Sequence, residues 1–276
     1  NSEALRRIFM SALRFATSSP PPSMNDLKSS AQEQLEYMLT EDDDAPLLVA
    51  DEELKHEVRG YTNQLFARFS NLVELLLCGP ASSISEEENM PSFQSYLSDV
   101  SWACQILNKL ESMKELAHSW VDASEKIIQA VGLTSLSSEM AKTRDKVIQV
   151  TSKVLEAIAA GAVIFPSPKR LHMVKLWLPF VRSARILLDA IPKEGEDAIE
   201  LRTDGETWQS LESSFVYIIL TLPSQDQAEI LSEWLESNHA QYPDLTEAFE
   251  VWCYRSKAAK KRLKQVFDSN GMENVA

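Results

Sequence analysis

The chain has 276 residues, with 27 Lys and Arg against 41 Asp and Glu, so its formal net charge at pH 7 is −14. Its 44% of hydrophobic and 25% of charged residues are typical of a globular protein and exclude extended disorder. Only 7 residues are glycine, which argues against sheet-rich folds and phosphate-binding loops, because hairpins, bulges and such loops use glycine where φ must be positive.

The N-terminal third of the chain predicts three helices. Residues 3–16 carry apolar side chains at helical spacing, and a proline triplet at 20–22 ends this helix. A second helix is predicted over 24–39. Asp51 is the predicted N-cap of a third, 51–78, because acids follow it in the first turn and one apolar face then continues for seven turns.

Residues 81–90 are polar and lack an apolar period, which predicts a mobile linker. We therefore expect an N-terminal helical subdomain, 1–80, and a C-terminal helical domain, 91–276.

The C-terminal part predicts seven further helices, over 91–111, 112–131, 137–160, 168–190, 205–221, 225–238 and 243–268. Ser167 followed by Pro168 predicts one N-cap, and Ser224 with Gln227 predicts a capping box. Pro179 is expected to bend or break its helix. The predicted fold is an all-α, multi-helix bundle of about ten helices, and an armadillo-type helical repeat remains open only in a degenerate form.

Two Glu-x-x-His pairs, Glu115 with His118 and Glu236 with His239, match one element of a di-iron site in a helical bundle. On a helix both pairs point away from the apolar face, whereas metal ligands in a bundle must point inward. We therefore predict surface residues. The sequence also lacks zinc-ligand spacing, a nucleophile motif and a nucleotide loop, so we predict no catalytic residues, no metal, no cofactor and no enzyme activity.

The three cysteines, Cys78, Cys104 and Cys253, lie in apolar runs without Cys-x-x-Cys spacing. They predict buried free thiols in a reducing, intracellular setting, the cytoplasm and/or the nucleus. No apolar run is long enough to cross a membrane. The start of the chain has neither an initiator Met nor a signal-peptide pattern, which predicts a piece of a larger protein.

The C-terminal run 254–264 contains six basic residues and no acid. Such a run could bind an acidic partner or nucleic acid. The simpler interpretation is a solvated helix end whose cations complement the helix dipole, because the rest of the chain is acidic and opposes duplex binding. Tryptophans in the C-terminal half are either core residues or interface anchors. The candidate partner-binding residues are Trp252, Tyr254, Arg255, Lys257, Lys260, Lys261 and Arg262.

Long stretches of the chain closely resemble the C-terminal region of plant BTB/POZ domain-containing proteins. These are EALRRIFMSAL (3–13), SDVSWACQILNKLESMKELAHSW (98–120), KVIQVTSKVLEAIAAG (146–161), KRLHMVKLWLPFVR (169–182), DGETWQSLESSFVYIILTLPSQDQAEILSEWL (204–235) and YPDLTEAFEVWCYRSKAAKKRL (242–263). The matches span almost the whole chain in order.

This resemblance implies a non-catalytic, substrate-specific adaptor of cullin-RING ubiquitin ligases. In such proteins a BTB/POZ domain precedes the helical region, binds the cullin and dimerises, and BACK-like helices after it present a surface to the protein substrate. The resemblance implies that residues 1–80 are the BACK-like part. This chain lacks sequence for the BTB domain, so cullin binding is expected only through the missing domain, and the chain alone is expected to be monomeric. The alternative is a helical scaffold or a nucleic-acid-associated protein that uses the basic C-terminal helix.

Overall fold

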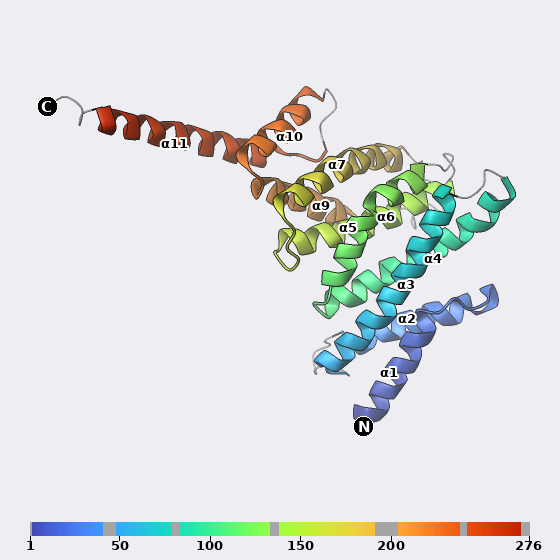
Figure 1. Cartoon of the computed structure of the whole chain (residues 1–276). Helices are drawn as coiled ribbons and strands as arrows, with labels where there is room; N and C mark the ends of the chain where they lie inside the picture. The colour runs from blue at the N-terminus through green and yellow to red at the C-terminus, as the bar shows by residue number, and fades with distance from the viewer. Residues whose placement is uncertain are drawn as a thin grey trace.

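The computed structural model describes residues 2–40, 48–78, 83–132, 138–190, 204–237 and 242–271, and within these ranges the chain forms ten α-helices, one short 3-10 helix and no strand (Figure 1). The elements are α1 (Ser2–Ala16), η1 (Pro22–Met24), α2 (Asn25–Met38), α3 (Glu52–Cys78), α4 (Ser83–Lys109), α5 (Lys114–Gly132), α6 (Ser138–Ala159), α7 (Ser167–Asp189), α9 (Gly205–Leu220), α10 (Ser224–Glu236) and α11 (Thr246–Gly271). The prediction of an all-α, multi-helix fold is confirmed.

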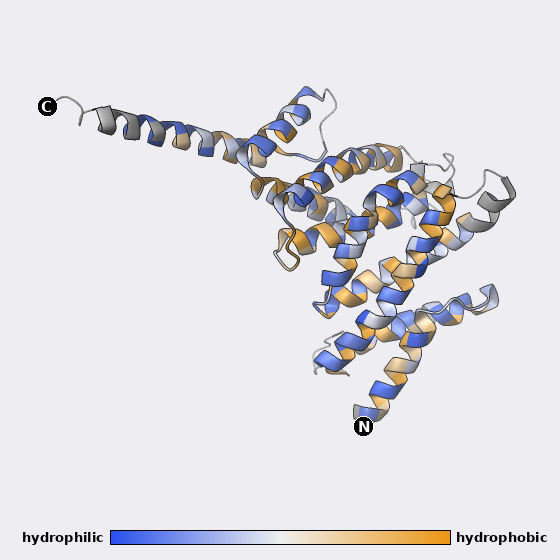
Figure 2. Ribbon diagram, in the orientation of Figure 1, coloured by the Kyte–Doolittle hydropathy of each residue, from blue (hydrophilic) through white to orange (hydrophobic). Residues whose placement is uncertain are grey.

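The helices pack around a continuous set of buried apolar side chains. α3 lies against α4 and α5, and α6 contacts α4, α5, α7 and α9. In Figure 1, α1 and α2 lie at one end of the molecule, and α11 extends away from the body near the other. Figure 2 shows the apolar and polar stripes that the sequence period predicts along most helices.

A line of four aromatic rings crosses the centre of this core, and we call it the aromatic stack. It consists of Phe93 from α4, Phe69 from α3, Trp120 from α5 and Trp177 from α7, with successive ring centroids 5.6, 6.2 and 6.2 Å apart. None of the four side chains is exposed. The indole N–H of Trp120 donates to the Thr151 hydroxyl at 3.3 Å, so burial leaves this polar group with a partner.

The predicted linker is wrong for residues 83–90, because α4 begins at Ser83 and continues through Pro91. The sequence of this segment has no apolar period, which is why the pattern indicated a loop. The division into 1–80 and 91–276 stays a prediction, although α3 and α4 pack closely against each other across it.

The helix start at Asp51 is confirmed. Its carboxylate accepts a hydrogen bond from the backbone N–H of Leu54 at 2.8 Å, directly before α3. This bond, assisted by the nearby Arg6 guanidinium, lowers the pKa of Asp51.

Two other predicted caps are wrong by one residue. Pro166 and Pro223 occupy the N-cap positions of α7 and α10, with φ of −63° and −55° and ψ near 150°. Proline is locked near this φ, so it takes the N-cap conformation before the serine that follows it. Gln227 forms no capping box and instead donates to the carbonyl oxygen of Leu222 at 2.6 Å, just beyond the end of α9. α7 remains one helix on both sides of Pro179, so the proline does not break it.

Replacing Asp204 with alanine is expected to destabilise the protein by about 0.5–1 kcal/mol, the lower half of the range for N-caps, because the site is exposed. Asp204 caps α9 by accepting the backbone N–H of Thr207 at 2.6 Å. Hydrogen bonds from Thr207, its hydroxyl first, lower the pKa of Asp204 below 3.8. The stabilisation is therefore present above pH 4 and lost as the pH falls through the folded-state pKa. Urea unfolding at several pH values measures this, and Asp204→Asn, which caps without titrating, is the control; equal losses in the two variants would contradict the prediction.

Within the described ranges, no helix combines the length and the apolar character needed to cross a bilayer.

Candidate functional site

In the Glu-x-x-His pair of α5, Glu115 faces solvent as the sequence predicts, whereas His118 is only partly exposed. Leu116 and Trp120 are buried, whereas Glu115 is exposed and accepts a hydrogen bond from the Asn63 side chain at 2.6 Å. His118 is half-buried, and its ring lies 4.4 Å from the Phe165 ring. Glu236 is also exposed, and its predicted partner, His239, lies outside the described residues. Among the residues that the structure describes, no three His, Cys, Asp or Glu side chains are grouped as metal ligands would be.

The three cysteines differ in exposure, whereas the sequence predicted that all three are buried. Cys104 is buried, and burial raises its pKa to about 12, so its thiol is protonated and unreactive at neutral pH. Cys253 is only half-buried, and Cys78 is exposed. The prediction of three buried thiols is therefore wrong for Cys78, because it is the last residue of α3 and lies beyond the part of the helix that packs on the core.

The first half of α11 is anchored to the body. Leu245 and Ala248 are buried, and the Tyr242 hydroxyl, just before the helix, donates to the carbonyl oxygen of Trp208 at 2.9 Å. The indole N–H of Trp252 lies 3.1 Å from both the carbonyl and the hydroxyl oxygen of Ser224. The Arg255 guanidinium donates to the Leu220 carbonyl at 3.2 Å. Two of the predicted partner-binding residues, Trp252 and Arg255, thus hold α11 in place.

The second half of α11 carries the remaining predicted residues into solvent. We call residues 257–264 the basic arm. Lys257, Lys260, Lys261, Arg262 and Lys264 are all exposed, and Figure 2 shows blue, hydrophilic turns along this part of α11. At 100° per residue, the four lysines fall within an arc of about 100°, whereas Arg262 points to the opposite side. The arm therefore presents a one-sided row of ammonium groups.

Tyr254 adds an aromatic side chain to this surface. It is 75% exposed, at the point where α11 leaves the body. An exposed aromatic ring beside a row of cations has the composition of an interface anchor, because Tyr and Arg are enriched in binding hot spots. The binding role of these residues stays a prediction.

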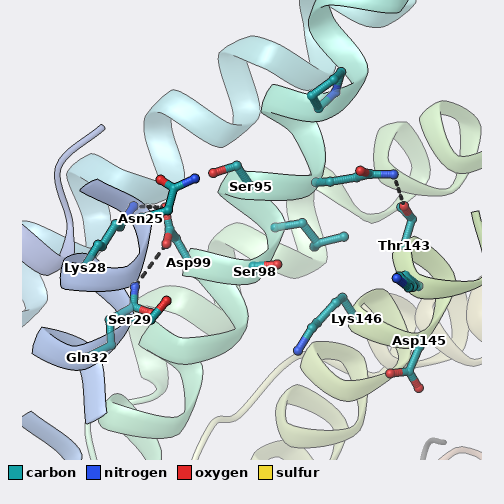
Figure 3. A pocket seen from close by; sticks show the side chains of 14 residues that line it. Asn25, Lys28, Ser29, Gln32, Ser95, Ser98, Asp99, Thr143, Asp145 and Lys146 are labelled. Carbon is teal, nitrogen blue, oxygen red and sulfur yellow. Dashed lines mark hydrogen bonds and ion pairs between the residues drawn. The ribbon is translucent and has the colours of Figure 1, made fainter. Parts of the chain in front are cut away.

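A second candidate surface was not predicted from the sequence. It is a polar cavity of about 650 Å³ beside α4, and we call it the α4 groove (Figure 3). It is lined by side chains from α2, α4 and α6: Asn25, Lys28, Ser29, Gln32, Pro91, Gln94, Ser95, Leu97, Ser98, Asp99, Lys142, Thr143, Asp145 and Lys146. These residues come from three distant segments, each unremarkable by itself, so only the fold identifies them as one surface.

A buried ion pair forms one side of the α4 groove. The Lys28 ammonium lies 2.5 Å from the Asp99 carboxylate and donates to the Ser18 carbonyl at 2.8 Å. The Gln32 amide donates to the other Asp99 oxygen at 3.0 Å. Burial raises the pKa of Asp99, and the hydrogen bond and charge of Lys28 oppose that rise. The pair ties α2 to α4 with both of its charges compensated.

The chain is similar to two Arabidopsis thaliana proteins. It is 54% identical over 277 residues to the BTB/POZ domain-containing protein At3g05675, an alignment that covers 99% of the chain and 62% of that relative. It is 26% identical over 162 residues to the BTB/POZ domain-containing protein At3g50780, covering 57% of the chain and 28% of that relative. The chain thus spans less than two thirds of the length of either relative. No family model matches the chain, and no solved structure matches it.

Proposed function

The chain is a relative of plant BTB/POZ domain-containing proteins, as the sequence resemblance predicted, and on this premise we propose that it is a non-catalytic protein-interaction region that recognises the substrate for a cullin-RING ubiquitin-ligase adaptor. BTB/POZ domain proteins are generally non-catalytic. In this proposal the helical region follows the BTB/POZ domain, the cullin binds that domain, and the intact protein acts in the cytoplasm or the nucleus.

The geometry of α11 is the observation that supports this role best. Its first half is fixed to α9 and α10, so the basic arm and Tyr254 are held out from the body in one orientation. A surface that is already ordered loses little conformational entropy on binding. We propose that Tyr254, Lys257, Lys260, Lys261 and Arg262 contact the protein substrate, while Trp252 and Arg255 position the helix.

Reversing two charges of the arm, Lys260→Glu with Lys261→Glu, is expected to reduce recovery of the substrate by the full-length protein at least about tenfold, while the cullin is retained. Both side chains are exposed, so the free energy of unfolding should change by less than about 0.5 kcal/mol. Proximity labelling with the intact protein in plant cells, quantified by mass spectrometry, measures both partners.

The matched control is Arg7→Glu with Lys114→Glu, which makes the same charge change at exposed positions of α1 and α5. It should leave both partners unchanged. If residues 1–276 alone retained a cullin, the adaptor proposal would be wrong. If the arm variant lost no partner, the arm would not be the substrate-binding surface.

The alternative is binding of nucleic acid by the arm. About 14 Å of helix separates Arg255, which contacts the body, from Lys264, and this exceeds the Debye length of about 8 Å at physiological salt. The acidic body therefore does not cancel the positive potential at the end of the arm. The net charge of −14 is thus a weaker argument against nucleic-acid binding by the arm. A filter-binding titration distinguishes the two functions: nucleic-acid binding requires an affinity that falls steeply with added salt and is lost in the arm variant.

A further inference from the structure

The outward face of α11 carries charged and aromatic side chains at the spacing of paired helices. Exposed positions recur along it at alternating intervals of three and four residues, which keeps one stripe of a helix facing a partner helix over several turns. We call these positions the α11 seam. They are Glu247, Glu250, Tyr254, Lys257, Lys261 and Lys264. At 100° per residue, they fall within an arc of about 100°.

The α11 seam points away from the body. Ala248 is buried, and Trp252 and Arg255 hydrogen-bond to the body, and all three lie on the opposite side of α11 from the seam. Figure 1 shows the second half of α11 extending beyond α9 and α10. No seam side chain has a hydrogen bond, ion pair or ring contact with any side chain that the structure describes. The seam therefore presents about 26 Å of helix to a partner.

The charge of the α11 seam changes sign along the helix. Its first two positions are acidic, its last three are lysines, and Tyr254 lies between them. Like charges one turn apart on the same helix repel each other, so a partner of opposite charge stabilises both ends of the seam. A second α11 lying parallel in register would place like charges opposite one another. A second α11 running antiparallel places acids opposite lysines, so the seam is complementary to its own reverse.

We propose that two copies of this chain pair through their α11 seams, with the helices antiparallel and a twofold axis between residues 255 and 256. In this register Glu247 faces the partner's Lys264. Glu250 faces the partner's Lys261. The twofold axis repeats both ion pairs, as in any interface in which two subunits use the same surface.

The centre of the proposed pair is aromatic. Tyr254 is 75% exposed, and in the same register it faces the partner's Lys257. An ammonium group is attracted to the negative face of a tyrosine ring, and the ring adds apolar area at the middle of a charged interface. Because each seam points away from its own body, the two acidic bodies lie on the outer sides of the helix pair. Two helix diameters, about 20 Å, then separate them, which exceeds the Debye length of about 8 Å at physiological salt.

This pairing is weak and reversible, because exposed ion pairs contribute little individually and are screened by salt. The chain is then monomeric when dilute and paired when concentrated. The pairing does not rest on the proposed substrate role of the basic arm. If both hold, pairing covers Tyr254, Lys257 and Lys261 and closes the arm to the substrate.

Sedimentation equilibrium of the purified 276-residue chain, over a range of protein concentrations, tests the pairing. We expect the average mass to rise toward that of a dimer at physiological salt. It should return to that of the monomer at about 1 M salt, where the Debye length is about 3 Å. No substrate is present, so the outcome is independent of the proposed function.

A charge exchange tests the antiparallel register. The basic-seam variant is Glu247→Lys with Glu250→Lys, and the acidic-seam variant is Lys261→Glu with Lys264→Glu. Each variant alone places like charges opposite one another and should self-associate at least about tenfold more weakly than the wild type. An equimolar mixture of the two restores opposite charges at every ion pair and should associate about as tightly as the wild type.

The matched control is Glu33→Lys with Glu125→Lys, the same charge change as in the basic-seam variant, at exposed positions of α2 and α5. It should self-associate like the wild type, and circular dichroism checks that each variant is folded. The proposal is overturned if the wild type stays monomeric at every concentration, or if the basic-seam variant associates as tightly as the wild type. It is also overturned if the control weakens as much as that variant, or if the mixture associates no more tightly than its components.

Discussion

Replacing Trp120 with alanine should lower the free energy of unfolding by about 3–5 kcal/mol, the largest loss that we expect from a single substitution in this chain. Trp120 is fully buried between Phe69 and Trp177, with its ring 6.2 Å from each. Its removal leaves a cavity between helices, because the Trp120 ring of α5 packs on Phe69 of α3 and on Trp177 of α7. It also leaves the Thr151 hydroxyl without the indole donor. Denaturant unfolding followed by circular dichroism measures the loss.

Two further variants separate the causes. Trp120→Phe keeps an aromatic ring in the stack but removes the N–H donor, so it should fall between the wild type and alanine. Tyr254→Ala removes an aromatic side chain that is 75% exposed and should change stability by less than about 0.5 kcal/mol. A Trp120→Ala protein as stable as Tyr254→Ala would show that the aromatic stack does not hold these helices together.

Replacing Lys28 with methionine should destabilise the protein by about 3 kcal/mol or more at pH 7. Asp99 would then keep the hydrogen bond from the Gln32 amide but lose its ion-pair partner, and a buried carboxylate without its paired cation is costly. The double variant Lys28→Met with Asp99→Leu should regain most of the loss, because it removes both charges. Urea unfolding of the single and double variants measures this difference. If the double variant is no more stable than the single one, the cost does not come from the uncompensated charge.

The loss in Lys28→Met should also depend on pH. Burial already raises the pKa of Asp99 above 3.8, and loss of the Lys28 charge raises it further. A carboxyl whose folded-state pKa exceeds its unfolded value favours folding less as the pH rises between the two values. The difference between the variant and the wild type should therefore be smaller at pH 4 than at pH 7.

The helices were predictable because each covers the core with one apolar face. α3 shows this best: Leu54, Val58, Leu65 and Phe69 were expected on one side, and all four are buried. The start of α4 escaped prediction because residues 83–90 have no apolar period in the sequence. The caps at Ser167 and Ser224 failed because the preceding prolines adopt the N-cap conformation in their place.

The candidate surfaces were predictable to different degrees. The basic arm is continuous in sequence, so Lys257 and Lys260 could be identified as charged neighbours before the fold was known. The sequence did not show that Trp252 anchors the helix, since a half-buried and an exposed indole have the same local pattern. The α4 groove was not predicted, because Ser29, Ser98 and Lys146 are brought together only by tertiary packing.

If the basic arm contacts a partner as proposed, the residues that determine binding differ from those that determine stability, which bears on how this region can diversify. The core depends on close packing, so most substitutions at positions such as Trp177 reduce stability. Residues 260 and 261 are exposed, so their identity can change at almost no cost to folding. Mutation can therefore explore new charge patterns on the arm while the body stays intact. Related chains with the same body could in this way acquire different binding preferences through a few neutral steps in one helix.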